Sequence, residues 1–194
     1  SDRFIDNSLL FRYKGKLIAV LPANREGDVL WSHQGLTYGG LVLSSKCTAD
    51  RVLNIFSLLF SWLSEQGFSK LVYKCVPDIY HRYPSQEDLY ALFRNNARLV
   101  ARNLSTTVSI PCRIPFSQLR RRGIKRALSC GIVVQESSDL ENFWRVLSEN
   151  LSDRYNRLPV HTVEEMSLLK GRFPNNIRLF TACKGERVVA GCVI

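Results

Sequence analysis

The chain has 194 residues, of which 45% are apolar and 23% charged, a composition typical of a folded globular protein and unlike that of disordered or collagen-like chains. Its formal net charge of +10 favours an acidic partner, such as a phosphate, a nucleotide, a nucleic acid or an anionic lipid surface. Six widely spaced Cys form no Cys-x-x-Cys pair, which argues against a zinc site and predicts free, mostly buried thiols in a reducing compartment.

The longest apolar run, 52–63, is too short to span a bilayer and contains polar residues. We therefore expect a cytoplasmic protein with no stable membrane insertion and no signal peptide. The chain begins with Ser1 and ends in a strand-like stretch, 186–194, that no turn follows. From these two ends we expect the sequence to be part of a longer polypeptide.

The first part of the chain predicts three strands. Two apolar runs within 8–21 flank Lys14-Gly15-Lys16, a pattern typical of a hairpin. Residues 22–28 are rich in turn formers and predict a turn, and 29–33 predict the third strand. A short strand is expected at 41–43.

The next elements alternate between helix and strand. Apolar residues recur at helical spacing over 48–66, a stretch that Gly67 ends, and they lie on most sides of the helix, which predicts burial against a sheet. A strand at 69–76, a helix at 84–95 and an extended segment at 97–110 follow.

A second unit begins at Pro111 and Pro115. It predicts helices at 116–129, 138–152 and 162–172, and strands at 132–135, 177–183 and 187–194. Thr162 and Glu165 form a capping-box pattern before the last helix. The expected fold class is α/β (α+β), with mixed, mostly antiparallel sheets flanked by helices, a first unit at 1–110 and a second at 111–194.

The loop 76–84 follows a strand and precedes a helix, where α/β proteins often place ligand groups. It offers Tyr80 and His81 as candidates for catalysis and Tyr83 for acceptor binding, with Arg82 as an anion contact. The alternative is a loop whose tyrosines pack and whose histidine is merely exposed. Asp88 and Glu87 are expected to be helix-start charges favoured by the helix dipole.

The helix at 116–129 carries the clearest charge pattern. At about 100° per residue, its basic side chains share one face and apolar ones, from Phe116 to Leu128, share the other. This pattern is typical of a solvated face, but it also predicts a phosphate clamp for a nucleotide, a lipid pyrophosphate or a tRNA backbone. The candidate anion-binding residues are Arg121, Arg122, Lys125 and Arg126.

Two segments share a pattern of strand, charged turn and strand with small residues, 17–24 and 178–194. The pattern resembles the central hairpin of the GNAT acetyltransferase superfamily. Two such units in tandem, with the basic stretch 119–127 and Gly131 opening the second, resemble the Fem-type branch. That branch is similar to the aminoacyltransferases that build peptidoglycan cross-bridges.

The resemblance implies an acyltransferase with two tandem GNAT-like units, the second incomplete here. An amine would attack a thioester or ester carbonyl without a covalent enzyme intermediate. The implied donor is acyl-CoA or aminoacyl-tRNA, the implied acceptor is a small-molecule or lipid-linked amine such as a cell-wall precursor or an amino sugar, and no metal is implied. The alternative function is a non-catalytic module that recognises an anionic polymer or a nucleic acid.

GNAT enzymes hold the acyl-CoA pyrophosphate in a Gln/Arg-x-x-Gly-x-Gly/Ala loop. The near match in this chain, Arg120 to Lys125, lies inside a predicted helix, so we expect the loop to lie beyond the sequence.

The glycine-rich stretch 31–43 does not match a phosphate cradle, because its glycines lead into another extended segment and not into a helix. The expected structure is a turn at a strand end, where glycines let the backbone pass close to a neighbour. His33 is the third catalytic candidate. The residues expected to face an acceptor are Gln34, Thr37, Tyr38, Gly39 and Gly40.

Overall fold

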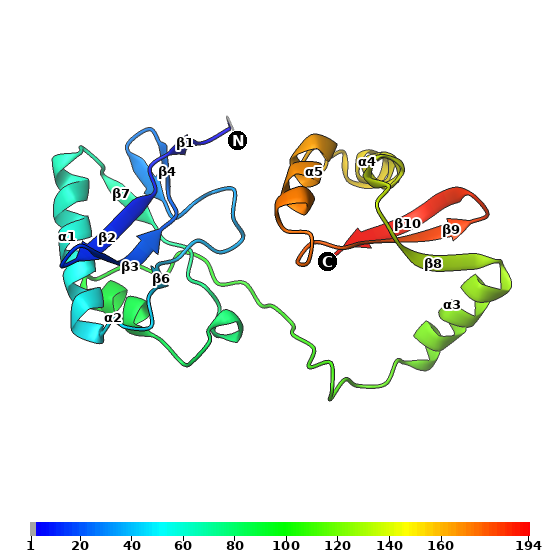
Figure 1. Ribbon diagram of the computed structural model, residues 1–194, viewed down its shortest axis with the longest axis horizontal. Helices are drawn as coiled ribbons and strands as arrows, with labels where there is room; N and C mark the ends of the chain where they lie inside the picture. The colour runs from blue at the N-terminus through cyan, green and yellow to red at the C-terminus, as the bar shows by residue number, and fades with distance from the viewer. Residues whose placement is uncertain (1–2) are drawn as a thin grey trace. The chain divides into compact units, whose positions relative to one another are not determined.

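The computed structural model describes residues 3–194, and the chain divides into two compact units, Ser1–Leu104 and Ser105–Ile194 (Figure 1). The boundary falls within 97–117, where no residue belongs to a helix or strand among those described. The boundary expected at Pro111 lies in the same segment. The division into two GNAT-like units stays a prediction.

The first unit contains two small sheets and two α-helices among its described residues. One sheet has the strand order β1-β4-β5-β7, antiparallel except for β5 and β7, and the other has the antiparallel order β2-β3-β6. The elements are β1 (Ile5–Asp6), β2 (Leu9–Tyr13), β3 (Lys16–Leu21), β4 (Asn24–Glu26), β5 (Val29–Trp31), β6 (Val42–Leu43), α1 (Ala49–Glu65), β7 (Lys70–Val72), the 3-10 turn η1 (Asp78–Tyr80) and α2 (Glu87–Arg94).

Helix α1 forms where the helical spacing predicted it (Figure 1). Five side chains of its apolar stripe are buried. Gly67 has a φ of +72°, which only glycine adopts readily, and the Phe68 N–H donates to the Leu63 carbonyl at 2.9 Å to close the helix end. The core around α1 also takes side chains from both sheets. Its thirteen buried members are Ile18, Ala19, Leu21, Ala23, Leu30, Leu41, Val52, Ile55, Phe56, Leu59, Leu63, Phe68 and Ala91.

Two local predictions for the first unit are wrong. The turn expected at 22–28 contains β4, which pairs with β5 around a tight turn at Gly27, whose φ is +59°. The extended segment expected at 97–110 forms no strand, because none of its backbone is paired in a sheet of the described residues. In both places the partner strand, not the local sequence, decides the structure.

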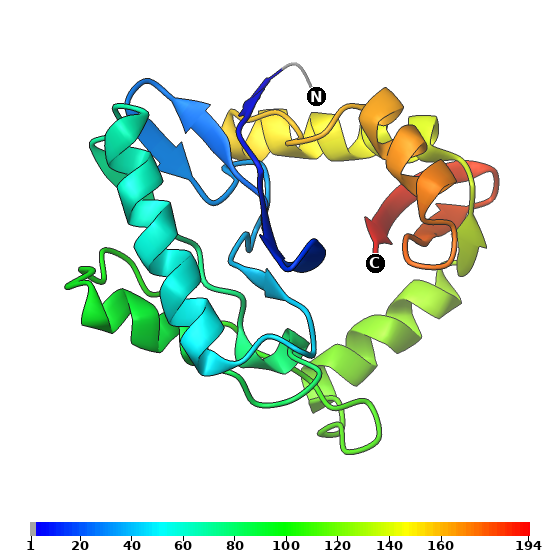
Figure 2. The same cartoon turned by 60° about the vertical axis from the view of Figure 1, so that its left-hand side comes forward.

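The second unit is one antiparallel sheet of order β10-β9-β8 with three helices among its described residues. Its elements are α3 (Gln118–Ser129), β8 (Ile132–Ser137), α4 (Leu140–Tyr155), α5 (Val163–Arg172), β9 (Leu179–Lys184) and β10 (Arg187–Val193). Figure 2 shows α4 and α5 near the sheet, and α4 packs on β10. A Cβ at Gly191 would lie 2.6 Å from the Phe143 ring, so the absence of a side chain there lets α4 approach the sheet.

The helix starts of the second unit follow their capping signals. The Asp139 side chain accepts from the Asn142 N–H at 3.0 Å, and the Thr162 and Glu165 capping box is present in full. Together the two units form a mixed fold with mostly antiparallel sheets, as the pattern of elements predicted.

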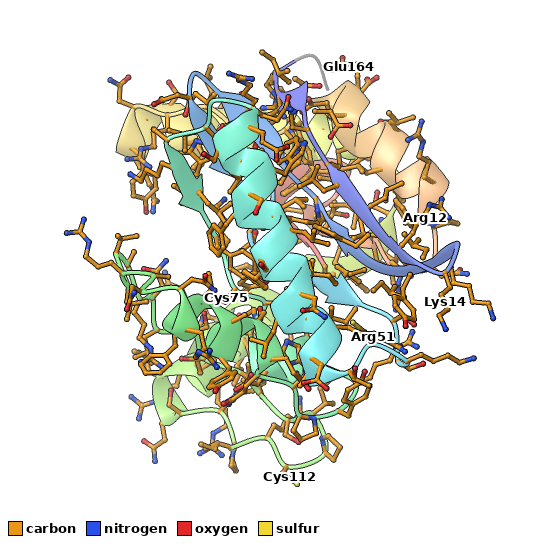
Figure 3. All side chains as sticks on the ribbon, turned by 90° about the vertical axis from the view of Figure 1, so that its left-hand side faces the viewer. Arg12, Lys14, Arg51, Cys75, Cys112 and Glu164 are labelled. Carbon is orange, nitrogen blue, oxygen red and sulfur yellow. The ribbon has the colours of Figure 1, made fainter. Side chains whose placement is uncertain are left out.

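The expectation of mostly buried thiols is wrong. All six cysteines are free, Cys47 and Cys183 are half-buried, and the other four are exposed; Figure 3 labels Cys75 and Cys112. Of the two half-buried cysteines, Cys47 packs against the core of the first unit and Cys183 lies on β9, the central strand of the second unit's sheet.

Candidate functional site

A pocket of about 550 Å³ lies in the first unit beside the loop that follows β7. Its wall comes from the segment that contains β6, from the loop through η1, and from the first turn of α2. It therefore gathers groups from three separate stretches of the chain. The lining residues are Leu41, Val42, Leu43, Ser44, Ser45, Val76, Tyr80, His81, Arg82, Tyr83, Ser85 and Asp88.

The loop 76–84 supplies the aromatic and titratable part of this wall. Pro77 caps η1, and the chain leaves the turn at His81 in an extended conformation, with a φ of −74° and a ψ of 140°. The Tyr80 ring lies against Tyr38, with ring centroids 5.2 Å apart, and hydrogen bonding to Tyr38 raises the pKa of the Tyr80 hydroxyl. Three residues expected in the site, Tyr80, His81 and Tyr83, thus share one pocket.

His81 is the most distinctive of these side chains. Its Nδ1 is buried and has no hydrogen-bond partner among residues 3–194, although the side chain as a whole is 20% exposed. Asp78 Oδ1 lies 3.8 Å from His81 Nδ1, which is beyond hydrogen-bonding distance. A buried polar atom without a partner is costly in a native structure. The hydrogen-bonding capacity of this nitrogen is therefore unused within the protein, in a side chain that lines the pocket.

Asp88 contributes a carboxylate to the same pocket, and sequence reasoning missed this role. It does lie in the first turn of α2, as expected of a helix-start charge, but its Oδ2 also accepts from the Tyr73 hydroxyl at 2.8 Å. The Leu41 N–H donates to the same hydroxyl oxygen at 2.6 Å. Burial, and after it the charge of Asp88, raises the pKa of Tyr73, so the phenol stays protonated and holds the carboxylate in place.

The neighbouring Glu87 is held differently. A hydrogen bond from the Ser85 hydroxyl lowers the pKa of the Glu87 carboxyl, with a smaller contribution from the charge of His81. Glu87 does not line this pocket, whereas Ser85 does. Of the two adjacent acids, Asp88 is the one placed to meet a ligand.

Only the last three residues of the glycine-rich stretch, Leu41 to Leu43, line the pocket; residues 31–40 do not. The Gln34 side chain accepts from Asn24 Nδ2 at 2.7 Å and donates to Glu26 Oε2 at 2.9 Å, so β4 holds it. Thr37 is exposed. Tyr38 packs against the ring of Tyr80 but does not itself line the pocket. His33 has a φ of +58° and accepts from the Gly35 N–H through Nδ1 at 3.2 Å.

Gly39 and Gly40 permit close contacts within the protein. A Cβ on Gly39 would lie 1.7 Å from the Ser32 carbonyl oxygen, and one on Gly40 would lie 3.0 Å from the Tyr73 hydroxyl. The expected close backbone approach is thus present, but the neighbour is the protein itself. Lys74 completes the turn, because its Nζ donates to the carbonyls of His33, Gln34 and Leu36 at 3.2, 3.2 and 2.8 Å.

The four candidate anion-binding residues, Arg121, Arg122, Lys125 and Arg126, lie exposed on α3 in the second unit. The near match to an acyl-CoA loop lies inside this same helix, where backbone amides bond within the helix and cannot cradle a pyrophosphate. The segment from Arg120 to Lys125 therefore does not fit that group, and the acyl donor stays a prediction.

No cluster of three or more His, Cys, Asp or Glu side chains suited to a metal occurs among residues 3–194. Within the same residues, every helix is too short or too polar to cross a bilayer. In comparisons with known proteins, the chain matches no protein-family model and no curated protein. The GNAT and Fem-type resemblance stays a prediction that rests on the quoted segments.

Proposed function

We propose that this chain carries the acceptor-binding part of an N-acyltransferase, and that the pocket of the first unit holds the amine. One observation carries the proposal: the unpartnered Nδ1 of His81 and the carboxylate of Asp88 belong to side chains that line the same pocket. A pocket of about 550 Å³ has the size of a small-molecule site.

The two groups match the chemistry that an amine acceptor needs. At neutral pH an aliphatic amine carries a proton and a positive charge, which the Asp88 carboxylate attracts. The amine attacks only after it loses that proton, and imidazole is the side chain that exchanges protons near neutrality. His81 accepts the first proton at Nδ1, and the lone pair of the amine nitrogen forms the new C–N bond with the acyl carbon. The C–S or C–O bond then breaks, and the leaving group departs with its electrons and takes up the second proton that the amine nitrogen loses.

Tyr73 acts as a positioning residue for Asp88. Because its hydroxyl donates to Oδ2 and is itself fixed by the Leu41 N–H, the carboxylate cannot turn away from the pocket without breaking a buried hydrogen bond. The aromatic wall of Tyr80 and Tyr83 suits the apolar face of a sugar ring, which favours an amino sugar over a simple alkylamine.

The test uses acetyl-CoA as donor and glucosamine as acceptor. Because the protein itself has six free thiols, released CoA is measured by chromatography and not with a thiol reagent. We expect amine-dependent CoA release, lowered about 100-fold or more in His81→Asn and Asp88→Asn. The control is His33→Asn, which retains activity since Asn tolerates the positive φ of that position.

A second readout follows amine binding directly by isothermal titration of glucosamine. Asp88→Asn should abolish the binding heat, whereas His81→Asn should retain most of it, because His81 acts on the proton and Asp88 on the charge. Absence of both binding and CoA release would contradict the proposal. Equal losses in His33→Asn and His81→Asn would assign the effect to folding.

The alternative proposal, a non-catalytic module for an anionic polymer, rests on the basic face of α3. Steeply salt-dependent RNA binding with no response to amine or acetyl-CoA would favour it.

A further inference from the structure

The positive charge of the chain is concentrated in one acid-free stretch. Residues 89–135 contain no Asp and no Glu, yet they hold nine Lys and Arg, against a net charge of +10 for the whole chain. Five of these lie on α3, where Arg121, Arg122, Lys125 and Arg126 share one side of the helix. None of the nine is in an ion pair among the residues that the structure describes.

The opposite side of α3 is apolar and uncovered. No residue of the helix is buried, and the exposed fractions are 81% for Leu119, 42% for Ile124 and 65% for Leu128. Figure 1 shows α3 leading into β8 with no other element of its unit packed along it. Phe116, just before the N-cap Ser117, is 53% exposed. The helix therefore presents two chemically different surfaces to its surroundings.

The two surfaces lie on opposite sides. At about 100° per residue, the four basic residues span an arc of roughly 140°, and Leu119, Ile124, Ala127 and Leu128 occupy the remaining side. Arg120 falls within the apolar side, where its long apolar stem can lie flat while its guanidinium reaches the polar layer above. We call residues 118–128 of α3 the amphipathic basic helix.

Among polyanions, this combination favours a lipid surface over a nucleic acid. Phosphates of either kind satisfy the basic side, but only a bilayer offers an apolar layer that removes Leu119, Ile124 and Leu128 from water. Sequence-tolerant binding of single-stranded nucleic acid also uses aromatic side chains for base stacking, and Phe116 is the sole aromatic residue in 97–135.

We propose that the amphipathic basic helix lies on an anionic bilayer surface, with its apolar side in the acyl-chain boundary and its basic side against lipid phosphates. The complementarity of charge and the uncovered apolar side are the two observations that carry it. The binding is peripheral and does not depend on the acyltransferase proposal, because it requires neither the pocket nor catalysis.

The experiment measures co-sedimentation of the full 194-residue chain with vesicles of phosphatidylcholine, with and without phosphatidylserine, at about 0.1 M salt. We expect binding only to the vesicles that contain phosphatidylserine. Each basic residue near such a surface contributes about a fivefold factor, so R121Q/R122Q/K125Q/R126Q should weaken binding more than about a hundredfold.

Matched controls separate the helix from net charge and from general hydrophobicity. The variant K14Q/K16Q/R154Q/R187Q also removes four positive charges, but from exposed sites outside the helix. It should bind the vesicles much more tightly than the helix variant does. The variant L119S/L128S keeps every charge but should bind about tenfold or more weakly, whereas L58S/L168S, at similarly exposed leucines, should bind as the unaltered chain does.

The same preparations are titrated with tRNA. Binding to tRNA that exceeds vesicle binding and is unchanged in L119S/L128S would overturn the proposal and assign the helix to nucleic acid. Failure to sediment with any vesicle, or equal loss in the two charge variants, would overturn it as well. Unchanged circular dichroism of each variant establishes that the exposed substitutions leave the fold intact.

Discussion

Helices α1 and α3 are both amphipathic, but their surroundings differ. Helix α1 buries five side chains in the core of the first unit, whereas α3 buries none in the second. The difference in charge accounts for part of this: α1 has apolar residues on most sides, and α3 has five Lys and Arg in twelve residues. Periodicity predicts that a helix has an apolar side, but it does not say what covers that side.

The two units also differ in how many apolar side chains they bury. Thirteen buried apolar residues form the core of the first unit, and four, Leu140, Phe143, Trp144 and Leu179, form that of the second. With less apolar burial, the second unit depends relatively more on its helix caps and on hydrogen bonds. Four predictions test this comparison.

The largest effect is expected in the first core. Phe56→Ala removes a ring that is 1% exposed and should lower the free energy of unfolding of the first unit by about 3–5 kcal/mol. Hydrogen exchange resolved by residue measures it, and amides of α4 and β9 should keep their protection. Phe93→Ala, at a ring that is 75% exposed, should change stability by less than about 0.5 kcal/mol. Equal loss of protection in both units would contradict the separation of the cores.

Two glycine substitutions should act in opposite directions. Gly39→Ala forces a Cβ against the Ser32 carbonyl oxygen and should destabilise the first unit by roughly 1–3 kcal/mol in urea unfolding. A Cβ on Gly123, in the middle of α3, would have no atom within 4 Å. Gly123→Ala should therefore stabilise α3 by about 0.5–1 kcal/mol, measured as increased helicity by circular dichroism. Unchanged stability of Gly39→Ala would show that the backbone of the turn can shift to make room for the Cβ.

The capping box should matter measurably to the small core. Thr162→Ala removes the side chain that accepts from the Glu165 N–H and should cost about 1 kcal/mol in urea unfolding of the second unit. Thr162→Ser restores the acceptor and should recover most of the loss. Thr107→Ala, at an exposed position outside any helix or strand, is the control; if it costs as much as Thr162→Ala, the cap has no special role.

The smallest effect concerns acid stability. Arg178 donates to both carboxylate oxygens of Glu136, at 2.9 and 2.6 Å, and this hydrogen bonding lowers the Glu136 pKa below 4.5. A depressed carboxyl pKa contributes stability above the unfolded value, and that stability is lost as the pH falls through the folded value. Glu136→Gln should therefore lower Tm slightly at neutral pH and flatten its fall below about pH 4.5. Glu149→Gln, with the same charge change on α4, should leave the Tm profile unchanged.

Elements with strong local signals were predictable. The hairpin around Lys14-Gly15, the stripe of α1 with its terminal Gly67, and the Thr162 capping box all form as expected, because each signal and its effect lie within a few residues. Strand β4 was missed because its three residues become a strand only by pairing with β5. The predicted burial of the cysteines was wrong because composition does not locate a residue in the fold.

The candidate site was partly predictable for the same reason. Residues of the loop 76–84 do line a pocket, and their role in ligand binding stays a prediction. The hydrogen bond from Tyr73, just after β7, to Asp88 on α2 joins residues fifteen positions apart, and no local pattern in the sequence marks it. A buried phenol near a helix-start acid was the only available signal, and it is common in structures without sites.

Lys74 changes how the glycine-rich stretch is understood. Its ammonium group meets three carbonyl oxygens of the turn at 33–36, so the oxygens of that turn converge on a positive charge. A phosphate cradle has the reverse polarity, with amide hydrogens converging on a negative charge. The turn is in effect a small cation receptor whose cation is part of the chain, so neutralising that one amine, by acetylation or by Lys74→Met, would leave three carbonyl dipoles in mutual repulsion.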